Sequence, residues 1–344
     1  MKIYYYHNVP ISEYYDKWLK GKLPGQILYG ITHLIKRGHK CVWHDIPFNP
    51  YTWRIRLAVY NLFKILFTPK EYEILYATTV RGIELLIILR ALGVYQKPIA
   101  LWHHTAVTNP KNKIRDFFSK LLYKGIDYTF FFSEELKNRS LLTKKIYPDN
   151  AAVIHWGGDL DFYDSYTCTE NNGFVSTGKE KRDFKTLISA INNLDYSFEI
   201  LLGSKHYLDI VKTCNNPNAR FYDNWIPVCQ STKAVADAYA ILICVLDFPY
   251  TLGLTTLVEA MALGKPIIST RNITFPFDIE KEGIGLLIDY GDVDGWKKAI
   301  VYIAEHPEEA YLMGQKGKRL AKKMYNLDIF SKEIETELLS ILPR

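Results

Sequence analysis

Two stretches of the sequence place glycine, hydroxyl and charged residues beside apolar runs. The first, "TLGLTTLVEAMALGKPIIST" at residues 251–270, predicts a loop, a helix that begins after Gly253, and a buried strand. A glycine lets a ligand approach the backbone, and the free N–H groups of a helix start attract anions. Thr255 and Thr256 either donate to such an anion or cap the helix. Glu259 is either a solvated helix residue or an acceptor for the two hydroxyls of a ribose.

The second stretch, "FVSTGKEKRDFKTLISAI" at residues 174–191, predicts a buried strand, a cationic loop and a helix. Lys179, Lys181 and Arg182 lie in the loop. Open α/β sheets bind ligands at the loops that follow the carboxyl ends of their strands. Three cations at such a place would offset the charge of a diphosphate, and the alternative is an ordinary solvated loop.

Short apolar runs alternate with helical patterns along the chain, which predicts an α/β protein with parallel sheets. "MKIYYYH", "KCVWHDI", "EILYATT", "KPIALWHHT" and "YTFFFS" read as strands, and "ILYGITHLIKRG" at residues 27–38 reads as a helix. The alternation restarts with "GFVSTG", "SFEILLG", "ARFYDN", "ILICVLD" and "KPIIST". Two doubly wound domains facing a cleft are therefore expected, with the boundary near the polar segment "DSYTCTENNG".

Composition excludes several classes of protein. A hydrophobic fraction of 48% in 344 residues favours folded domains over disorder, and a net charge of +6 is too small to indicate a nucleic-acid partner. The five cysteines show no C-x-x-C spacing, which argues against a zinc site or a disulfide framework. The first residues lack the apolar core of a signal peptide, and no apolar stretch is long enough to span a bilayer. A cytoplasmic location is expected.

Four segments resemble, in order, those of one enzyme family. They are "VIHWGGDLDFYD", "GKEKRDFKTLISA", "GLTTLVEAMALGKPII" and "GIGLLIDYGDVDGWKKAI". The chain resembles the retaining nucleotide-sugar glycosyltransferases of the GT-B fold (family 4-like, glycosyl transferases group 1). The resemblance implies two Rossmann-like domains: an acceptor-binding domain at residues 1–165 and a nucleotide-sugar domain at 166–325. It also implies a final helix at 326–344 that packs back on the first domain.

The resemblance assigns roles to the glycine, hydroxyl and charged residues of the two stretches described first. Lys179 and Arg182 would hold the donor diphosphate, with Lys181 and Lys185 as second choices. Glu259 would bind the ribose, and the helix start that faces the donor consists of Gly253, Leu254, Thr255 and Thr256. The family pairs this glutamate with an earlier one, whose place is taken by Thr251, so donor-sugar contacts are expected to differ, with Asp247 or backbone amides serving instead.

Residues of the first domain complete the expected site. "KPIALWHHTAV" ends a strand with two histidines, and the family places one histidine at such an end, facing the reacting sugar. His104 matches that position better than His103; without the family, either would read as an ordinary surface or core residue. Pro24-Gly25-Gln26 matches the family's glycine-rich first loop, reduced here to Gly25. The acidic pairs Asp159/Asp161 and Asp292/Asp294 read as structural, and no metal or other cofactor is expected.

Residues 53–70 predict an amphipathic helix. Ile55, Val59, Leu62, Phe63 and Leu66 share one face, with Arg54, Arg56, Lys64 and Lys70 nearby. This pattern suits a helix in an anionic membrane interface or a helix that packs on the core. The family resemblance favours the membrane, because many such enzymes take lipid-borne acceptors.

The expected function is transfer of a sugar, with retention, from a nucleotide sugar (a UDP-sugar by family frequency) to a lipid-borne or glycan acceptor. Synthesis of cell-envelope glycolipids or polysaccharides would use such an enzyme on the cytoplasmic face of the membrane. The alternatives are a nucleotide-sugar 2-epimerase, a phosphorylase, and a degenerate GT-B protein that only binds. Turnover of donor with candidate acceptors would separate them.

Overall fold

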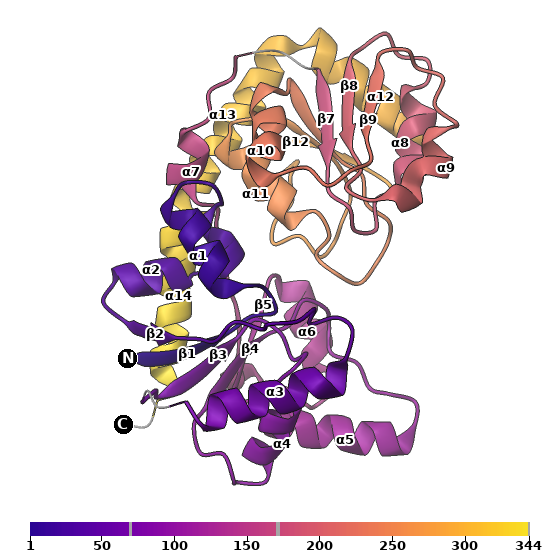
Figure 1. Ribbon diagram of the computed structural model, residues 1–344. Coiled ribbons are helices and arrows are strands. Elements are labelled where there is room, and N and C mark those ends of the chain that lie inside the picture. The colour runs from indigo at the N-terminus through magenta and orange to yellow at the C-terminus, as the bar shows by residue number, and fades with distance from the viewer. Residues whose placement is uncertain (69–70, 170–172, 343–344) are drawn as a thin grey trace. The chain divides into compact units, whose positions relative to one another are not determined.

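The computed structural model describes residues 1–68, 71–169 and 173–342 (Figure 1). The chain forms two compact units, one of residues 1–21, 25–155 and 327–344 and the other of residues 22–24 and 156–326. The chain passes from the first unit to the second at 155/156, whereas the sequence predicted this change at 165/166. Lys70, which the sequence analysis grouped with the helix at 53–70, lies outside the described residues.

The first unit is built on a parallel sheet of six strands in the order β2-β1-β3-β4-β5-β6. The strands are β1 (Lys2–Tyr6), β2 (Lys40–Val42), β3 (Ile74–Ala77), β4 (Ile99–Trp102), β5 (Tyr128–Phe131) and β6 (Ala151–Val153). Its helices are α1 (Ile11–Leu19), η1 (Gly25–Leu28), α2 (Ile31–Lys36), α3 (Arg54–Leu66), α4 (Glu84–Ala91), α5 (Lys113–Lys124), α6 (Glu134–Leu141), η2 (Pro148–Asn150) and α14 (Leu327–Ser340).

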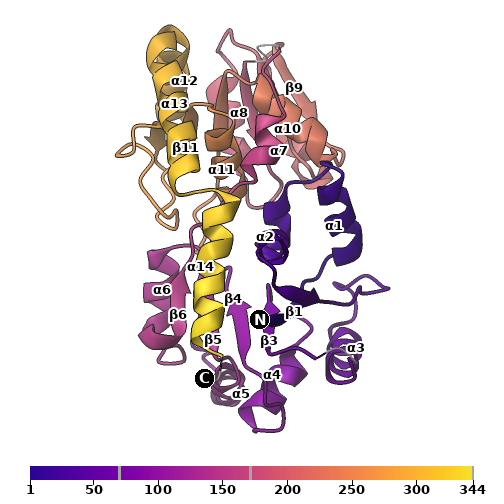
Figure 2. The ribbon, with the colours of Figure 1, turned by 90° about the vertical axis from the view of Figure 1, so that its left-hand side faces the viewer.

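Both faces of this sheet are buried, as continuous apolar strands require. Tyr4 and Tyr6 pack on one face with residues of α3 and α4, while Tyr5, between them, points to the opposite face. On that opposite face Trp102 packs against Phe330 of α14, with 5.7 Å between ring centroids. Helices α2 and α14, far apart in sequence, lie side by side there (Figure 2).

The second unit repeats the architecture with a parallel sheet of six strands in the order β12-β11-β10-β7-β8-β9. The strands are β7 (Phe174–Thr177), β8 (Phe198–Leu201), β9 (Ala219–Tyr222), β10 (Ala240–Ile243), β11 (Ile267–Thr270) and β12 (Gly285–Ile288). Its helices are α7 (Leu160–Asp164), α8 (Phe184–Ile191), η3 (Lys205–Tyr207), α9 (Leu208–Val211), α10 (Val228–Asp237), α11 (Leu254–Ala262), α12 (Val293–Glu305) and α13 (Pro307–Lys323).

The strand order places the switch point of the second sheet between β7 and β10. Chain connections from β7 run toward β8 and β9 on one side, and those from β10 run toward β11 and β12 on the other. The loops that leave two such neighbouring strands diverge, which opens a crevice at their carboxyl ends. The cationic loop after β7 and the glycine loop before α11 therefore meet at this point.

One expectation about the helices needs correction, and one helix was not anticipated. The helix expected at residues 27–38 is divided into η1 and α2, because Gly30 between them has a left-handed backbone with φ of 81°. Helix α1, which the sequence analysis did not anticipate, precedes them. In the part of the chain that the structure describes, no helix has the length and apolar character that crossing a membrane needs.

Candidate functional site

The loops after β7 and β10 are joined by backbone hydrogen bonds. Asp183 N donates to Cys244 O at 3.2 Å, and Leu246 N donates to Lys181 O at 2.9 Å. Arg182 lies between these two bonds and pairs with Val245 in an isolated antiparallel bridge. The backbone of Arg182 is thus fixed at the switch point of the sheet.

The Arg182 side chain is enclosed by two glycines. It is only 6% exposed. A Cβ on Gly178 would lie 2.0 Å from Arg182 Nη2, and a Cβ on Gly253 would lie 3.3 Å from Nη1. Nη2 donates to Thr256 Oγ1 at 3.3 Å. Glycine at both positions therefore gives the guanidinium room against the start of α11.

The Arg182 guanidinium forms no salt bridge among the described residues, and the charge of Glu180 acts on it only from a distance. Its Nε and Nη1 are buried and make no hydrogen bond there. Burial lowers the pKa of Arg182. Burying a charge without a partner destabilises a fold by several kcal/mol. An anion bound here would supply hydrogen-bond acceptors to Nε and Nη1 and would offset that cost.

The start of α11 adds further donors beside Arg182. Gly253 is the N-cap residue, with φ of 83°, a conformation that glycine adopts without strain. Leu254 is buried, Thr255 is exposed, and Thr256 is buried with its hydroxyl 3.3 Å from that of Thr177. The first N–H groups of a helix carry a partial positive charge, which reinforces the preference for an anion.

Glu259 lies on the second turn of the same helix and is 8% exposed. Its Oε1 accepts a hydrogen bond of 2.7 Å from Thr232 Oγ1 of α10. Burial raises the pKa of Glu259 to about 7, although the Thr232 hydroxyl acts in the opposite direction. Glu259 is therefore held in the interior of the unit. This excludes the first alternative from the sequence analysis, a solvated helix residue.

The lysines of the cationic loop differ from Arg182. Lys179, Lys181 and Lys185 are exposed. The Lys181 ammonium stands 5.2 Å from the ring centroid of Phe248, and the Lys179 carbonyl accepts a 3.1 Å hydrogen bond from the Tyr207 hydroxyl. The loop thus presents one buried cation, Arg182, and two exposed ones, Lys179 and Lys181, and Lys185 adds an exposed cation on the first turn of α8.

Thr251, which the sequence analysis matched to the family's first glutamate, is buried. It is 6% exposed, and its hydroxyl donates to Thr274 O at 3.4 Å. Asp247, the substitute that the sequence suggested, is exposed on the loop after β10. Thr251 therefore fixes the loop before α11.

In the first unit, the two histidines after β4 occupy different surroundings. His103 is stacked between Tyr123 and Phe131, and burial, followed by the neighbouring His104, lowers its pKa to about 4. His104 Nε2 lies 3.0 Å from Thr78 O, and its ring packs on Tyr29. His103 is thus held by ring packing as a half-buried residue, and His104 lies at the carboxyl edge of the sheet.

Two residues at that edge were missed by the sequence analysis. His7 follows β1, and burial, then His104, lower its pKa to about 3. Tyr29 contacts the rings of both His7 and His104. Gly25 begins the short helix η1 and is buried; Ile27 of that helix makes a backbone hydrogen bond to His7. Only the folded sheet brings these segments together, so no local signal could have identified them.

The acidic pairs occupy helix starts. Asp159 caps α7 by accepting from Phe162 N at 3.3 Å, and Asp292 caps α12 by accepting from Gly295 N at 2.8 Å. Among the described residues no group of three or more metal-ligating side chains is found.

Comparison with known proteins identifies the fold. Residues 252–320 match the family of glycosyl transferases group 1. No curated protein matches the chain. Among solved structures, Anabaena HepE in complex with UDP is 13% identical with a TM-score of 0.67, and the match covers 99% of this chain and 100% of that one.

Two further structures give the same result. Sucrose-phosphate synthase from Thermosynechococcus elongatus is 14% identical, with a TM-score of 0.74 over 99% of this chain and 98% of that one. WaaG, a glycosyltransferase involved in lipopolysaccharide biosynthesis, is 10% identical, with a TM-score of 0.63 over 98% and 99%. The chain therefore has the GT-B fold, and its second unit contains a glycosyl transferases group 1 segment, as the resemblance predicted.

Proposed function

We propose that the chain is a retaining glycosyltransferase that moves a sugar from a nucleotide sugar, UDP-linked in the first instance, to a lipid-borne or glycan acceptor. One observation carries the proposal. Arg182 is buried without a salt bridge among the described residues, at the switch point of the second sheet and against a helix start. A donor diphosphate supplies the charge and the acceptors that this site lacks.

The neighbouring residues take the remaining parts of the donor. Glu259, on the same helix as the Gly253–Thr256 start, accepts the ribose hydroxyls. Lys179 approaches the diphosphate from the solvent side as an exposed cation. The UDP bound by HepE in its solved complex supports the choice of nucleotide.

Replacement of Arg182 tests the donor site. Arg182→Ala should lower UDP affinity by roughly 10- to 100-fold, because charge-assisted hydrogen bonds are lost, without lowering the free energy of unfolding. Titration calorimetry measures the affinity. Arg220→Ala, at an exposed arginine of the same unit, is the matched control and should bind UDP normally. Equal UDP affinity in the Arg182 and Arg220 variants would remove the basis of the proposal.

The chemistry we propose needs no metal ion. Arg182 and the α11 start neutralise the departing diphosphate, and a phosphate oxygen takes the acceptor's proton while the acceptor attacks from the same face. NMR analysis of the product should show the donor's anomeric configuration retained, and turnover should persist in EDTA. An inverted product, or turnover that EDTA abolishes and Mn²⁺ restores, would contradict this mechanism.

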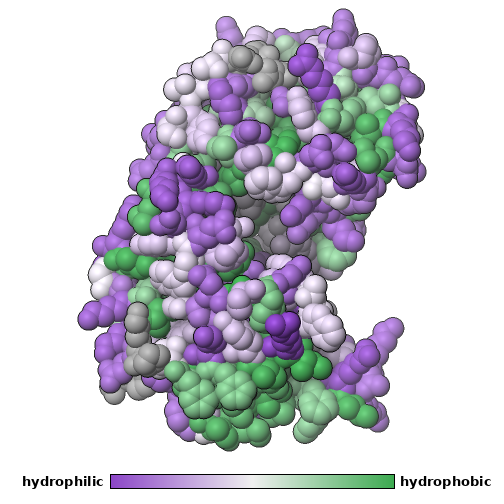
Figure 3. Space-filling model, viewed as in Figure 1, coloured by the Kyte–Doolittle hydropathy of each residue, from purple (hydrophilic) through white to green (hydrophobic). Residues whose placement is uncertain are grey.

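A lipid-borne acceptor is supported by helix α3 in the first unit. Ile55, Phe63 and Phe67 are 81%, 56% and 74% exposed. An apolar hollow of about 610 Å³, lined by Trp53, Ile55 and Val59 among others, opens at the start of this helix. Figure 3 shows apolar surface over this part of the first unit. We propose that α3 contacts the membrane from which the acceptor is taken.

The packing of α3 makes a sharp test possible. Leu62 packs against the core, whereas Phe63 is exposed. Phe63→Ser should therefore weaken binding to vesicles that contain anionic lipid and leave the melting temperature unchanged, and Leu62→Ser should lower the melting temperature. Flotation and thermal melts measure the two effects. Unchanged flotation of folded Phe63→Ser would exclude this contact.

A further inference from the structure

A chain of hydrogen-bonded side chains runs through the first unit between α3 and the sheet and ends at the carboxyl edge of β1. Its members, in order, are Tyr4, His44, Asn61, Tyr6 and Asn8. Asn61 is fully buried, and Tyr6 and Asn8 are only 1% and 8% exposed. Leaving a buried polar group without a partner is costly, so the direction of each hydrogen bond in such a chain is tightly constrained.

The directions follow from one backbone carbonyl. Asn61 Nδ2 donates to Gly82 O at 2.9 Å, and a carbonyl can only accept, so the Asn61 amide has one orientation. The same Nδ2 donates to the Tyr6 hydroxyl at 2.8 Å, and Asn61 Oδ1 lies 2.9 Å from His44 Nε2. His44 therefore carries its proton on Nε2, and its Nδ1 accepts from the Tyr4 hydroxyl at 2.8 Å.

Asn8 ends the chain with an unused donor. The Tyr6 hydroxyl accepts from Asn61 and donates to Asn8 Oδ1 at 2.6 Å, with Arg81 O at 2.8 Å. Asn8 N donates to His7 Nδ1 at 2.8 Å. The backbone and the side-chain oxygen of Asn8 are thus fixed, while its Nδ2 makes no hydrogen bond in the described part of the chain. Nδ2 is not one of the enclosed polar atoms that lack a partner, so a ligand can reach it.

The loop after β3 closes over this chain only because it contains a glycine. A Cβ on Gly82 would lie 2.2 Å from the Tyr6 hydroxyl and 2.7 Å from Asn61 Nδ2. Any side chain at this position would therefore displace the two groups that orient the Asn8 amide.

Asn8 shares an edge with the histidine that the proposed reaction uses. Strands β1, β3 and β4 are neighbours in the sheet. Thr78, after β3, donates from its N to Tyr6 O at 3.0 Å, and its own carbonyl lies 3.0 Å from His104 Nε2. Asn8 and His104 therefore follow the first and the last of three adjoining strands.

The groups around Asn8 favour an uncharged ligand. His7 is neutral at pH 7, since burial and then His104 lower its pKa to about 3, and its ring packs on that of Tyr29. The Arg81 guanidinium donates to the carbonyls of Pro50 and Tyr51 at 3.0 and 2.9 Å. A fixed amide donor beside neutral rings suits a hydroxyl oxygen better than a phosphate.

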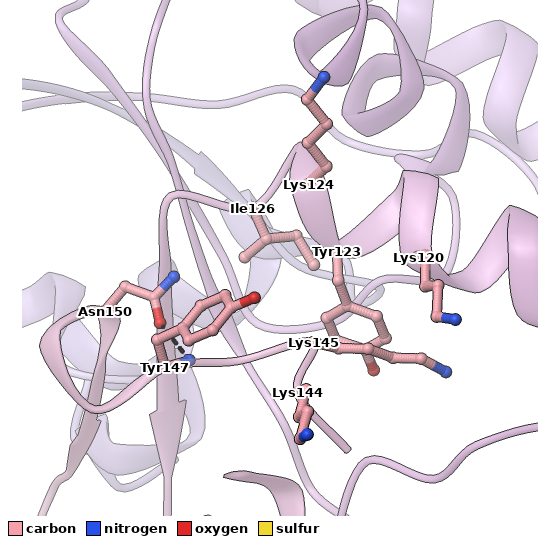
Figure 4. A pocket seen from close by; sticks show the side chains of 8 residues that line it. All are labelled: Lys120, Tyr123, Lys124, Ile126, Lys144, Lys145, Tyr147 and Asn150. Atoms are coloured by element: carbon pink, nitrogen blue, oxygen red, sulfur yellow. Dashed lines mark hydrogen bonds between the residues drawn. The ribbon is translucent and has the colours of Figure 1, made fainter. Parts of the chain in front are cut away.

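A hollow elsewhere in the first unit shows the contrast. It has a volume of about 450 Å³ and is lined by lysines of α5 and of the connection before β6 (Figure 4). Lys120 and Lys145 are both paired with Asp116, at 2.8 and 3.0 Å, and Asn150 Oδ1 accepts from Tyr147 N at 2.9 Å. These polar groups hold the unit together, whereas the Asn8 amide keeps a donor that the fold does not use.

We propose that Asn8 Nδ2 donates a hydrogen bond to a hydroxyl oxygen of an acceptor sugar, and that His44, Asn61 and Tyr6 position the amide for it. The group that receives the transferred sugar is then itself a sugar. This assignment rests on the proposed function for the reaction that follows binding. Its test measures binding at the first unit alone and does not involve the donor.

Saturation-transfer NMR of the full chain tests the proposal with the methyl glycosides of glucose, galactose, mannose and N-acetylglucosamine. The natural chain should bind at least one of them. Asn8→Leu, which is similar in size but has no donor, should bind that glycoside roughly 5- to 10-fold more weakly, as the loss of one hydrogen bond does. UDP affinity should stay normal.

Monodeoxy forms of the bound glycoside identify the contact. One of them should bind roughly 5- to 10-fold more weakly than its parent to the natural chain and about equally to Asn8→Leu, because the two changes remove the same hydrogen bond. A change that only loosened the fold would weaken the parent and its deoxy forms alike.

Tyr6→Phe tests the positioning role. It removes the hydroxyl that holds Asn8 Oδ1, so it should lower the melting temperature and weaken glycoside binding roughly 2- to 5-fold. Tyr95→Phe is the matched control. The Tyr95 hydroxyl is buried in the same unit and donates to the Tyr72 hydroxyl at 3.1 Å, so this variant should lower the melting temperature and keep glycoside affinity.

Four results would each overturn the proposal. They are a natural chain that binds none of the glycosides, full glycoside affinity in Asn8→Leu, the same preference among deoxy forms in both chains, and equal losses of binding in Tyr6→Phe and Tyr95→Phe. A natural chain that binds a glycoside through Asn8 but does not bind UDP would support this contact and contradict the proposed function.

Discussion

The carboxyl edges of the two sheets carry opposite chemistry on the same architecture. At the edge of the second sheet a buried arginine lies without a salt bridge among the described residues, and a buried Glu259 lies on the second turn of α11, whose start adjoins that arginine. At the edge of the first sheet the ionisable groups are His7 and His104, packed around Tyr29, and burial favours the neutral form of His7. Two doubly wound sheets thus differ through the loops and helices that follow their strands.

If the proposed function is correct, the difference separates two tasks that the reaction contains. A diphosphate needs fixed positive charge, which the second edge offers. A sugar is uncharged and is recognised by hydrogen bonds and ring contacts, which the first edge offers. We therefore expect substitutions at the two edges to affect different kinetic constants.

The largest effect is expected for His104. His104→Ala should lower kcat by roughly 100- to 1000-fold, as the loss of a contact made in the transition state does, with UDP affinity unchanged. Steady-state kinetics and UDP titration give the two values. His103→Phe, which keeps a ring between Tyr123 and Phe131, should leave kcat nearly normal. A parallel fall in UDP affinity for His104→Ala would erase the distinction between the edges.

The next effect concerns Glu259 and pH. Its pKa is raised from 4.5 to about 7 in the folded chain, so the buried carboxylate destabilises the fold above pH 7 and no longer does so below pH 4.5. Glu259→Gln removes this cost. The variant's free energy of unfolding should therefore rise relative to the natural chain by roughly 3 kcal/mol between the two limits.

Denaturant unfolding across this pH range measures the difference, with Glu180→Gln, an exposed glutamate, as the flat control. Glu259→Gln should also weaken binding of UDP itself. A pH-independent difference in stability, together with normal UDP affinity, would reduce Glu259 to a helix residue without a ligand.

A smaller effect is expected at Gly178. A Cβ there would meet the Arg182 guanidinium at 2.0 Å, on a backbone with φ of 108°. Gly178→Ala should lower UDP affinity about tenfold by displacing the guanidinium, and should cost about 1–2 kcal/mol of stability. Gly291→Ala, with φ of 74° and open space around it, carries the backbone strain alone. It should lose stability and keep UDP affinity.

The second edge was the more predictable from sequence because its signals are local. A buried strand, then glycine and cations, then a helix, occur within residues 174–191, and Gly253 opens α11 as its position in the sequence indicates. What the sequence could not supply was the burial of Arg182, which depends on Gly178 and Gly253 meeting across two loops. Thr232, the partner of Glu259, lies on another helix and carries no signal of its own.

The first edge depends on contacts between distant segments. His7, Tyr29 and His104 come from three separate loops, and their sequence surroundings are unremarkable. The prediction of a single helix at residues 27–38 did not account for the left-handed backbone of Gly30. An isolated glycine is compatible with a helical pattern, so nothing in the pattern indicated the break. Leu62 and Phe63 were grouped on one face of α3, yet packing against α4 separates the buried side from the exposed one.

The central claim is that the Arg182 guanidinium, which forms no salt bridge in the described part of the chain, is kept for the donor diphosphate. Titration of UDP and of uridine against the natural chain and Arg182→Gln tests it most directly, because uridine keeps the base and ribose but lacks the phosphates. The natural chain should prefer UDP by on the order of a hundredfold, and Arg182→Gln should lose most of that preference while its uridine affinity stays the same. An unchanged preference for UDP in Arg182→Gln, or an equal loss of uridine binding, would contradict the account.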